Sequence, residues 1–126
     1  MANVLVVDDD PDFVEIVRTI LTAKDHQVST AANGKQALAA MHKQKPDLVL
    51  LDVMMSYVLD GLDVTETMSS DPDLKQIPII MISSLPSTRY ADMFPTDRHV
   101  AIDDWISKPV KPADLLQRVD RLLQIQ

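Results

Sequence analysis

Short apolar runs that end in acidic side chains constrain this chain more than any other feature of its sequence. Residues 4–7 (VLVV) lead into three consecutive aspartates at 8–10, and residues 48–51 (LVLL) lead into Asp52. Runs of this length, separated by stretches with helical periodicity, predict buried parallel strands joined by helices. The carboxyl ends of such strands share one edge of the sheet, where ligands usually bind. The sequence therefore predicts a cluster of carboxylates at that edge.

Two further segments are expected to reach the same edge. Residues 77–82 are apolar and are followed by Ser83, and residues 103–107 are followed by Lys108 and Pro109. A hydroxyl group and an ammonium group would then join the carboxylates. Such a set of side chains can bind a divalent metal and carry a phosphoryl group.

Capping residues and helical periodicity predict where the helices lie between the strands. The expected starts are Asp10-Pro11, Asn33-Gly34, Asp60-Gly61 and Pro112, and the short second strand is expected near residues 27–31. The third helix should run to about Ser70. Pro86 and Pro95 lie in the segment 85–103, so a fourth helix there should be short or distorted. We interpret residues 1–126 as one α/β domain with no output domain attached.

Composition excludes several classes of protein. Lys and Arg number 12 against 19 Asp and Glu, which gives a net charge of −7 and disfavours contact with nucleic acid or an anionic membrane. The chain has no cysteine, so it has neither disulfides nor thiolate metal ligands. No signal peptide or membrane span is visible, and a cytoplasmic location is expected. The histidines, His26, His42 and His99, lack metal-ligand spacing and are interpreted as surface residues.

The predicted carboxylate cluster has a definite chemistry. Neighbouring carboxylates repel one another unless a cation offsets their charge, and Mg²⁺ is a natural partner, although ligand type alone also admits Ca²⁺. With the cation in place, one carboxylate can attack phosphorus and become an aspartyl phosphate. Taken singly, Asp10 is explained as a helix cap, and Ser83 or Lys108 as an ordinary strand-end residue. Their joint occurrence at the ends of separate strands favours the functional interpretation.

These residues resemble the receiver domain of two-component response regulators, the family of the chemotaxis protein CheY. The resemblance covers essentially the whole chain and rests on residues 4–10 (VLVVDDD), 48–55 (LVLLDVMM), 60–61 (DG), 79–84 (IIMISS) and 103–110 (DDWISKPV). It implies a doubly wound, flavodoxin-like sheet of five parallel strands in the order 2-1-3-4-5, with five helices. It also implies a signalling domain rather than an enzyme, phosphorylated by a sensor histidine kinase or a histidine phosphotransfer protein. A downstream protein would bind the face formed by helix 4, strand 5 and helix 5, and the chain would be a monomer or weak homodimer.

The resemblance also implies roles for individual residues. Asp52 corresponds to the phosphoacceptor, and the Mg²⁺ ligands would be Asp8, Asp9, Asp52 and the main-chain carbonyl of Met54. Ser83 and Lys108 would contact the phosphoryl group, Ser83 and Trp105 would form the conformational switch, and Pro109 would follow a cis peptide bond. Two segments depart from the family pattern. Ser56 replaces an expected proline in a loop, residues 56–59, that is one residue longer than expected, and the stretch from Ser83 to Lys108 is also extended.

Two alternatives remain open at this point. One is a degenerate receiver that binds partner proteins without being phosphorylated, which the altered loops favour and the intact residue set disfavours. The other is a small phosphohydrolase of the haloacid-dehalogenase kind, with Asp8 as nucleophile and Asp10 as acid/base. Asp12 stands where that family has Thr or Val, and the chain is too short for a cap domain. A dinucleotide-binding domain is disfavoured because Gly34 and Gly61 are the only glycines, so no phosphate-cradling loop is present.

Overall fold

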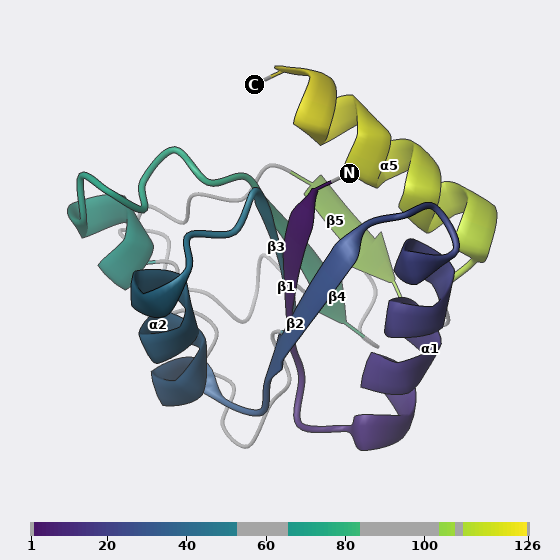
Figure 1. The fold of residues 1–126 in the computed structure, drawn as a ribbon, viewed down its shortest axis with the longest axis horizontal. Coiled ribbons are helices and arrows are strands. Elements are labelled where there is room, and N and C mark those ends of the chain that lie inside the picture. Colours follow the sequence, from purple (N-terminus) through teal and green to yellow (C-terminus); the bar gives the residue numbers. More distant parts are fainter. Residues whose placement is uncertain (1, 53–65, 84–103, 108–109, 126) are drawn as a thin grey trace.

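A sheet of parallel strands forms the centre of the molecule in the computed structural model, which describes residues 2–52, 66–83, 104–107 and 110–125. The strands are β1 (Asn3–Val7), β2 (Gln27–Ala31), β3 (Leu48–Asp52), β4 (Ile79–Ser83) and β5 (Asp104–Ser107). Their spatial order is β2-β1-β3-β4-β5, and all neighbouring strands run parallel (Figure 1). This order agrees with the one that the family resemblance implies.

Helices cover both faces of the sheet, as the crossover connections of parallel strands require. The helices α1 (Pro11–Thr22) and α5 (Pro112–Ile125) lie on one face, and α2 (Gly34–Lys43) lies on the other (Figure 1). Residues 66–70 are also helical, in agreement with the predicted end of the third helix. The predicted fourth helix falls in residues 84–103, outside the described ranges. Among the described helices, none is long and apolar enough to cross a membrane.

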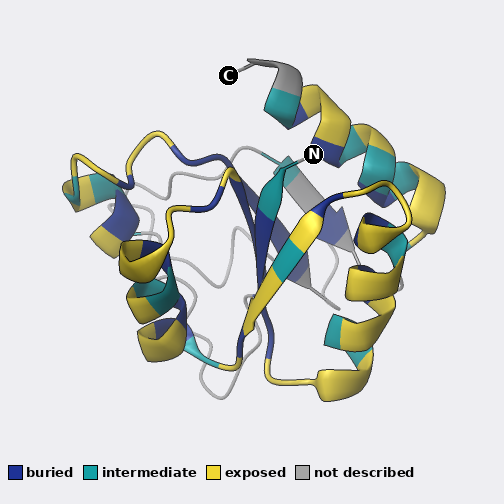
Figure 2. Cartoon of the chain, in the orientation of Figure 1, coloured by how far each residue is buried: buried dark blue, intermediate teal, exposed yellow. Residues whose placement is uncertain are grey.

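Alternation along the strands divides the core into two layers. Leu5 and Val7 of β1 pack in the layer beneath α2, whereas Val4 and Val6 pack in the layer beneath α1 and α5. All residues of β3 are buried, because both of its faces are covered. Figure 2 shows these buried strands at the centre and exposed residues on the outer sides of the helices. Burial on both faces explains why the central strands are continuous apolar runs.

Polar residues before α1 and α2 satisfy the backbone N–H groups that a first helical turn leaves unpaired. Oδ1 of Asp10 accepts hydrogen bonds from the N–H groups of Asp12 (3.0 Å) and Phe13 (3.4 Å). At α2, Oδ1 of Asn33 accepts from the N–H of Gln36 (2.8 Å). Both caps confirm the predicted helix starts, and each typically contributes about 1 kcal/mol to stability.

The fourth strand begins later than predicted. The apolar run predicts a strand from Ile77, but β4 begins at Ile79. Pro78 has no N–H to donate to the sheet, and the N–H of Ile77 donates to the carbonyl of Leu74 in the preceding turn (3.1 Å). The prediction for residues 77 and 78 is therefore wrong, because the proline delays the strand.

His26 is buried, so the prediction that it lies on the surface is wrong. The main-chain N–H of His26 donates to the carbonyl of Leu21 (3.2 Å), and the main-chain N–H of Asp25 donates to the carbonyl of Thr22 (3.0 Å). Asp25 has a φ of 65°. This pattern is a Schellman turn, which brings the residue after the left-handed position back toward the helix. The imidazole is only 7% exposed, and its Nε2 lies 4.0 Å from Oδ1 of Asp120 on α5.

An ion-pair network joins the start of β5 to α5. Oδ1 of Asp104 accepts a 2.6 Å hydrogen bond from Nη1 of Arg118, and Oδ2 accepts one from Nη2 of Arg121. Arg118 also donates from Nε to Oδ1 of Asp114 at 3.0 Å. The pKa of Arg118 is raised, mainly by the hydrogen bond to Asp114 and further by the charge of Asp104. Partial burial of the guanidinium lowers this pKa, but by less than its partners raise it.

Candidate functional site

The register of the sheet brings Asp8 and Asp52 together. Val7 of β1 pairs with Leu51 of β3, so the next residue along each strand lies at the shared carboxyl edge. The N–H of Asp8 donates to the carbonyl of Ala31 at the end of β2 (3.0 Å), which fixes the backbone where β1 ends. Both aspartates are only 3% exposed. The two central strands therefore hold two buried carboxylates side by side.

Asp9 completes a cluster of three carboxylates. One carboxylate oxygen from each of Asp8, Asp9 and Asp52 lies within 4.8 Å of the others. Asp9 is exposed whereas the other two residues are buried, so the cluster is accessible to solvent from the Asp9 side. The convergence that the sequence predicts for these three side chains is therefore observed.

The donor set of this cluster fits a hard divalent cation. Buried carboxylates close to one another oppose folding unless positive charge offsets them. Mg²⁺ is bound in proteins by one or two carboxylates together with water and phosphate oxygens. Two buried carboxylates and a third exposed to solvent provide such ligands together with access for water. A phosphoryl group bound at the same cation would lie close to the Asp52 carboxylate.

Asp10 links this cluster to α1 by hydrogen bonds on both of its sides. Its N–H donates to Oδ1 of Asp8 at 2.9 Å, and its carbonyl accepts from the N–H of Val14 at 3.1 Å. Its own carboxylate caps the first turn of α1. The connection from β1 to α1 is thus short and held at several points.

The other predicted site residues are described only in part. Ser83 is the last residue of β4 and follows Ile82, the register partner of Asp52, so its backbone lies at the same edge. Trp105 is in β5 and pairs with Met81. The side chains of Ser83 and Trp105, all atoms of Met54, Lys108 and Pro109, and the altered segments 56–59 and 85–103 lie outside the described part of the structure.

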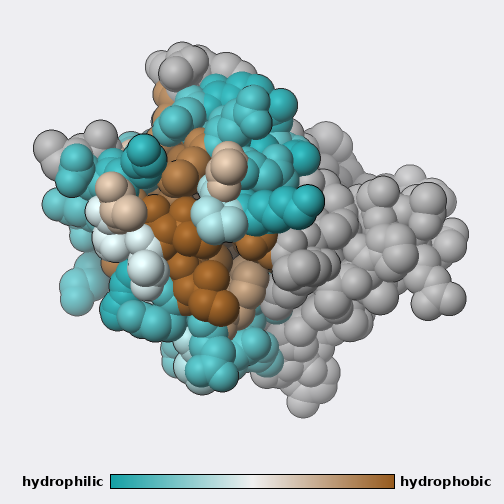
Figure 3. Space-filling view, turned by 90° about the vertical axis from the view of Figure 1, so that its right-hand side faces the viewer, coloured by the Kyte–Doolittle hydropathy of each residue, from teal (hydrophilic) through white to brown (hydrophobic). Residues whose placement is uncertain are grey.

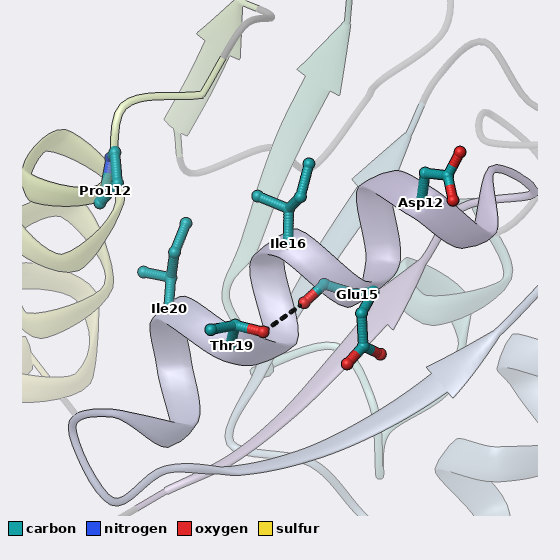
Figure 4. Close-up of a pocket in the computed structure, with 6 residues that line it drawn as sticks. All are labelled: Asp12, Glu15, Ile16, Thr19, Ile20 and Pro112. Atoms are coloured by element: carbon teal, nitrogen blue, oxygen red, sulfur yellow. Dashed lines mark hydrogen bonds between the residues drawn. The ribbon is translucent and has the colours of Figure 1, made fainter.

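A hydrophobic band crosses the face that bears α1 and α5 (Figure 3). On this face an open groove of about 470 Å³, called here the α1 groove, is lined by Asp12, Glu15, Ile16, Thr19, Ile20 and Pro112. Figure 4 shows Ile16 and Ile20 projecting from one side of α1, with Pro112 of α5 opposite. The Thr19 hydroxyl is engaged within the helix, since Oγ1 donates to the carbonyl of Glu15 (2.9 Å).

Sequence reasoning missed the α1 groove, although a signal for it was present. The apolar stripe of α1 consists of Phe13, Val14, Val17, Ile20 and Leu21. Ile16 falls outside this stripe. It is 55% exposed, and among the residues that the structure describes it is the one large hydrophobic residue that is exposed. An exposed isoleucine at the edge of the core-facing stripe, four residues before Ile20, is therefore the feature that could have indicated an apolar groove on α1.

Comparison with known proteins identifies relatives of this chain. Residues 4–120 match the response regulator receiver domain family. The DNA-binding response regulator MtrA of Mycolicibacterium smegmatis is 34% identical over 117 residues, which cover 93% of this chain and 48% of MtrA. The response regulator PleD of Caulobacter vibrioides is 34% identical over 129 aligned positions, which cover 99% of this chain and 27% of PleD. The chain spans about half the length, or less, of the curated relatives that it matches.

Solved structures with the same fold agree with these relatives. The chemotaxis response regulator CheY4 of Vibrio cholerae superimposes with a TM-score of 0.84 at 30% identity and covers 97% of this chain and 98% of its own. The receiver domain of a signal transduction histidine kinase from Syntrophus aciditrophicus gives a TM-score of 0.82 at 30% identity, with 98% and 91% covered. Together with the sheet order and the acidic cluster, these matches show that the chain belongs to the response regulator receiver domain family.

Proposed function

We propose that this chain is a receiver in which Asp52 accepts a phosphoryl group from a sensor histidine kinase or a histidine phosphotransfer protein, with Mg²⁺ as cofactor. The observation that carries the proposal is the position of Asp52. Its carboxylate is buried at the end of β3, within 4.8 Å of the carboxylates of Asp8 and Asp9. Receiver domains bind Mg²⁺ at an acidic pocket of this kind.

The proposed transfer is a nucleophilic displacement at phosphorus. A carboxylate oxygen of Asp52 bonds to phosphorus while the phosphorus–nitrogen bond of the donor phosphohistidine breaks, and the electron pair of that bond returns to the imidazole. When bound, Mg²⁺ supplies positive charge that offsets the carboxylates and the phosphoryl oxygens. Asp8 and Asp9 would hold the cation, and burial of Asp52 limits access of water to the carboxylate. The product is an aspartyl phosphate.

The remaining roles follow from the family resemblance. Lys108 and Ser83 would contact the phosphoryl group, the carbonyl of Met54 would complete the protein ligands of Mg²⁺, and Pro109 would shape the loop after β5. Phosphorylation adds about −1.5 to −2 charge, which is enough to bias a two-state element. Ser83 and Trp105 would convey this change to the helix 4–β5–α5 face, where a downstream protein binds. The chain would act on no separate substrate and would catalyse only its own phosphorylation and dephosphorylation.

We infer that the phosphodonor protein docks in the α1 groove. A donor has to bring its phosphohistidine to Asp52, so its docking surface has to border the acidic site. The α1 helix begins directly after the three aspartates, and Asp12 in its first turn lines the groove. Ile16 offers exposed apolar area, and the carboxylates of Asp12 and Glu15 favour a partner with basic residues at the rim.

The setting of this activity is part of the same proposal. We propose a cytoplasmic location, which is the location expected from the sequence. We also expect no direct contact between residues 1–126 and nucleic acid, because a net charge of −7 repels phosphate groups. The relative MtrA is named a DNA-binding regulator, and the chain covers 48% of it, so this expectation applies to the receiver alone.

Phosphorylation with acetyl phosphate, followed by mass spectrometry and peptide mapping, tests the proposal. The wild type should gain one phosphoryl group only in the presence of Mg²⁺, on Asp52, and Asp52→Asn should gain none. Asp73→Asn, which alters an exposed aspartate outside the cluster, is the control and should label normally. Label on Asp8 would instead indicate a phosphohydrolase of the haloacid-dehalogenase kind. A folded wild type that takes no label from acetyl phosphate or from any of a panel of kinases would indicate a phosphorylation-independent binding module.

A further inference from the structure

We propose that Asp10 is a positioning residue for the metal site, through which the first turn of α1 fixes the carboxylate of Asp8. The inference rests on the proposed function, since it assigns a role toward the Mg²⁺ that Asp8, Asp9 and Asp52 would bind. Asp10 itself stands outside the group of three clustered carboxylates found among the described residues. Its contribution is therefore made through hydrogen bonds rather than by ligating the cation.

The first link is the hydrogen bond between the main chain of Asp10 and the side chain of Asp8. The N–H of Asp10 donates to Oδ1 of Asp8 at 2.9 Å. The backbone of Asp8 is held separately, since its N–H donates to the carbonyl of Ala31 at 3.0 Å. With its backbone fixed to β2 and one oxygen fixed by Asp10, the Asp8 carboxylate has little freedom to rotate. The amide of Asp10 therefore helps to set the direction of this carboxylate.

The second link is the helix cap, which determines the backbone conformation of Asp10. Oδ1 of Asp10 accepts from the N–H groups of Asp12 and Phe13, and the carbonyl of Asp10 accepts from Val14. The residue is extended, with φ of −95° and ψ of 106°, a conformation that the following Pro11 also favours. Removing the side-chain oxygen would leave the two main-chain hydrogen bonds of Asp10 and the proline to hold this conformation.

The third link is the packing of α1 against the core, which holds the capped first turn in place. Phe13 and Val14 in the first turn are half-buried against the core layer that contains Val17 and Leu21. Because this packing anchors the helix in the core, the position of its first turn does not depend on the short loop before it. The capped first turn of this anchored helix therefore holds Asp10, and through Asp10 the carboxylate of Asp8, in place. An uncapped first turn would fray and release the loop.

Two substitutions at Asp10 separate this positioning role from the effect of charge. Asp10→Ser keeps a side-chain oxygen that caps well, whereas Asp10→Ala has none, and both remove the same charge. The dissociation constant for Mg²⁺, measured by titration calorimetry at fixed ionic strength, is the readout. We expect Asp10→Ala to bind Mg²⁺ about tenfold more weakly than Asp10→Ser, the low end of the effects seen when partners that orient metal ligands are removed.

The control removes a cap of the same kind from a different helix, α2, which follows β2 rather than β1. Asn33→Ala takes away the side-chain acceptor at the start of α2 and should lower stability without changing the affinity for Mg²⁺. Equal affinity in Asp10→Ser and Asp10→Ala would overturn the inference, and so would an equal weakening in Asn33→Ala. If Asp10→Ala does not fold, Asp10→Gly, which is milder at a cap position, replaces it. Failure of the wild type to bind Mg²⁺ would contradict the proposed metal site, and this inference with it.

Discussion

Asp8 and Asp52 lie one residue beyond the register pair Val7 and Leu51 on neighbouring central strands, and each is only 3% exposed. Two buried carboxylates at this spacing oppose folding by their mutual repulsion and by the loss of hydration. The central strands β1, β3 and β4 are otherwise largely apolar and buried, so the stability of the sheet can tolerate this cost at the edge. Such a violation of ordinary core composition is typical of a functional site.

Asp52→Asn should stabilise the metal-free protein. The substitution removes one charge from the cluster, and two unit charges about 4 Å apart repel by about 1 kcal/mol even at the dielectric constant of water. For a chain of this size, that corresponds to a rise in Tm of about 3–5 °C. Thermal unfolding in EDTA followed by circular dichroism measures the shift, with Asp73→Asn as the exposed control. A lower Tm for Asp52→Asn than for the wild type would show that the cluster does not carry unfavourable charge.

Mg²⁺ should stabilise the wild type, and the increase in stability should grow with the logarithm of its concentration once that concentration exceeds Kd. A ligand that binds only the folded state adds about 2.7 kcal/mol when its free concentration is 100 times Kd. The increase in Tm should be much smaller in Asp52→Asn, which has lost one of the three clustered carboxylates. Titrations with MgCl₂ and NaCl at matched ionic strength separate binding from screening. The same Tm in both salts would count against a cation site at this edge.

The parts of the fold that the sequence predicts are those set by local signals. Asp10 and Asn33 cap the two helices as expected, because N-cap chemistry involves residues two or three positions apart. The meeting of Asp8 with Asp52 is a long-range feature. It is nevertheless predictable, because the topology of a parallel sheet brings every carboxyl strand end to one edge.

The parts that the sequence does not predict depend on individual backbone conformations or on contacts between distant elements. His26 is buried because Asp25 adopts a left-handed conformation usually taken by glycine, so no glycine marks the turn. The α1 groove requires Pro112 of α5 to lie beside α1, and Pro112 is far from Ile16 and Ile20 in the chain. The late start of β4 results from Pro78, which lies within the apolar run but has no N–H to donate to the sheet.

Ile16→Asp should impair phosphorylation by a protein donor and leave phosphorylation by acetyl phosphate unchanged. Ile16 is 55% exposed, so the substitution should change the free energy of unfolding by less than about 0.5 kcal/mol. Loss of a central apolar contact and repulsion from an added carboxylate should lower kcat/KM for transfer at least about tenfold, equivalent to roughly 1.4 kcal/mol. Ile16→Leu is the matched control and should transfer normally. Equal transfer rates in all three proteins would place the donor elsewhere.

Asp104→Asn should weaken the attachment of β5 to α5. The Asp104 side chain is 11% exposed and accepts hydrogen bonds from both Arg118 and Arg121, so we expect a loss of about 1–2 kcal/mol in urea unfolding. Arg121→Gln should cost no more than about 0.5 kcal/mol, because the Arg121 side chain is 59% exposed. Asp114 and Asp104 raise the pKa of Arg118, so the stability due to its charge is fully present below the unfolded-state pKa and is lost only as the pH rises through the folded-state pKa.

The Arg118 contribution to this network should therefore not vary with pH across the neutral range. A double-mutant cycle of Asp104→Asn with Arg118→Gln measures the coupling directly, because Arg118 keeps its second partner, Asp114, when Asp104 is changed. We expect a favourable coupling energy of about 1 kcal/mol that changes little between low and moderate salt, since the Asp104 side chain is largely buried. Strictly additive effects of the two substitutions would show that the contact between Asp104 and Arg118 does not hold β5 against α5.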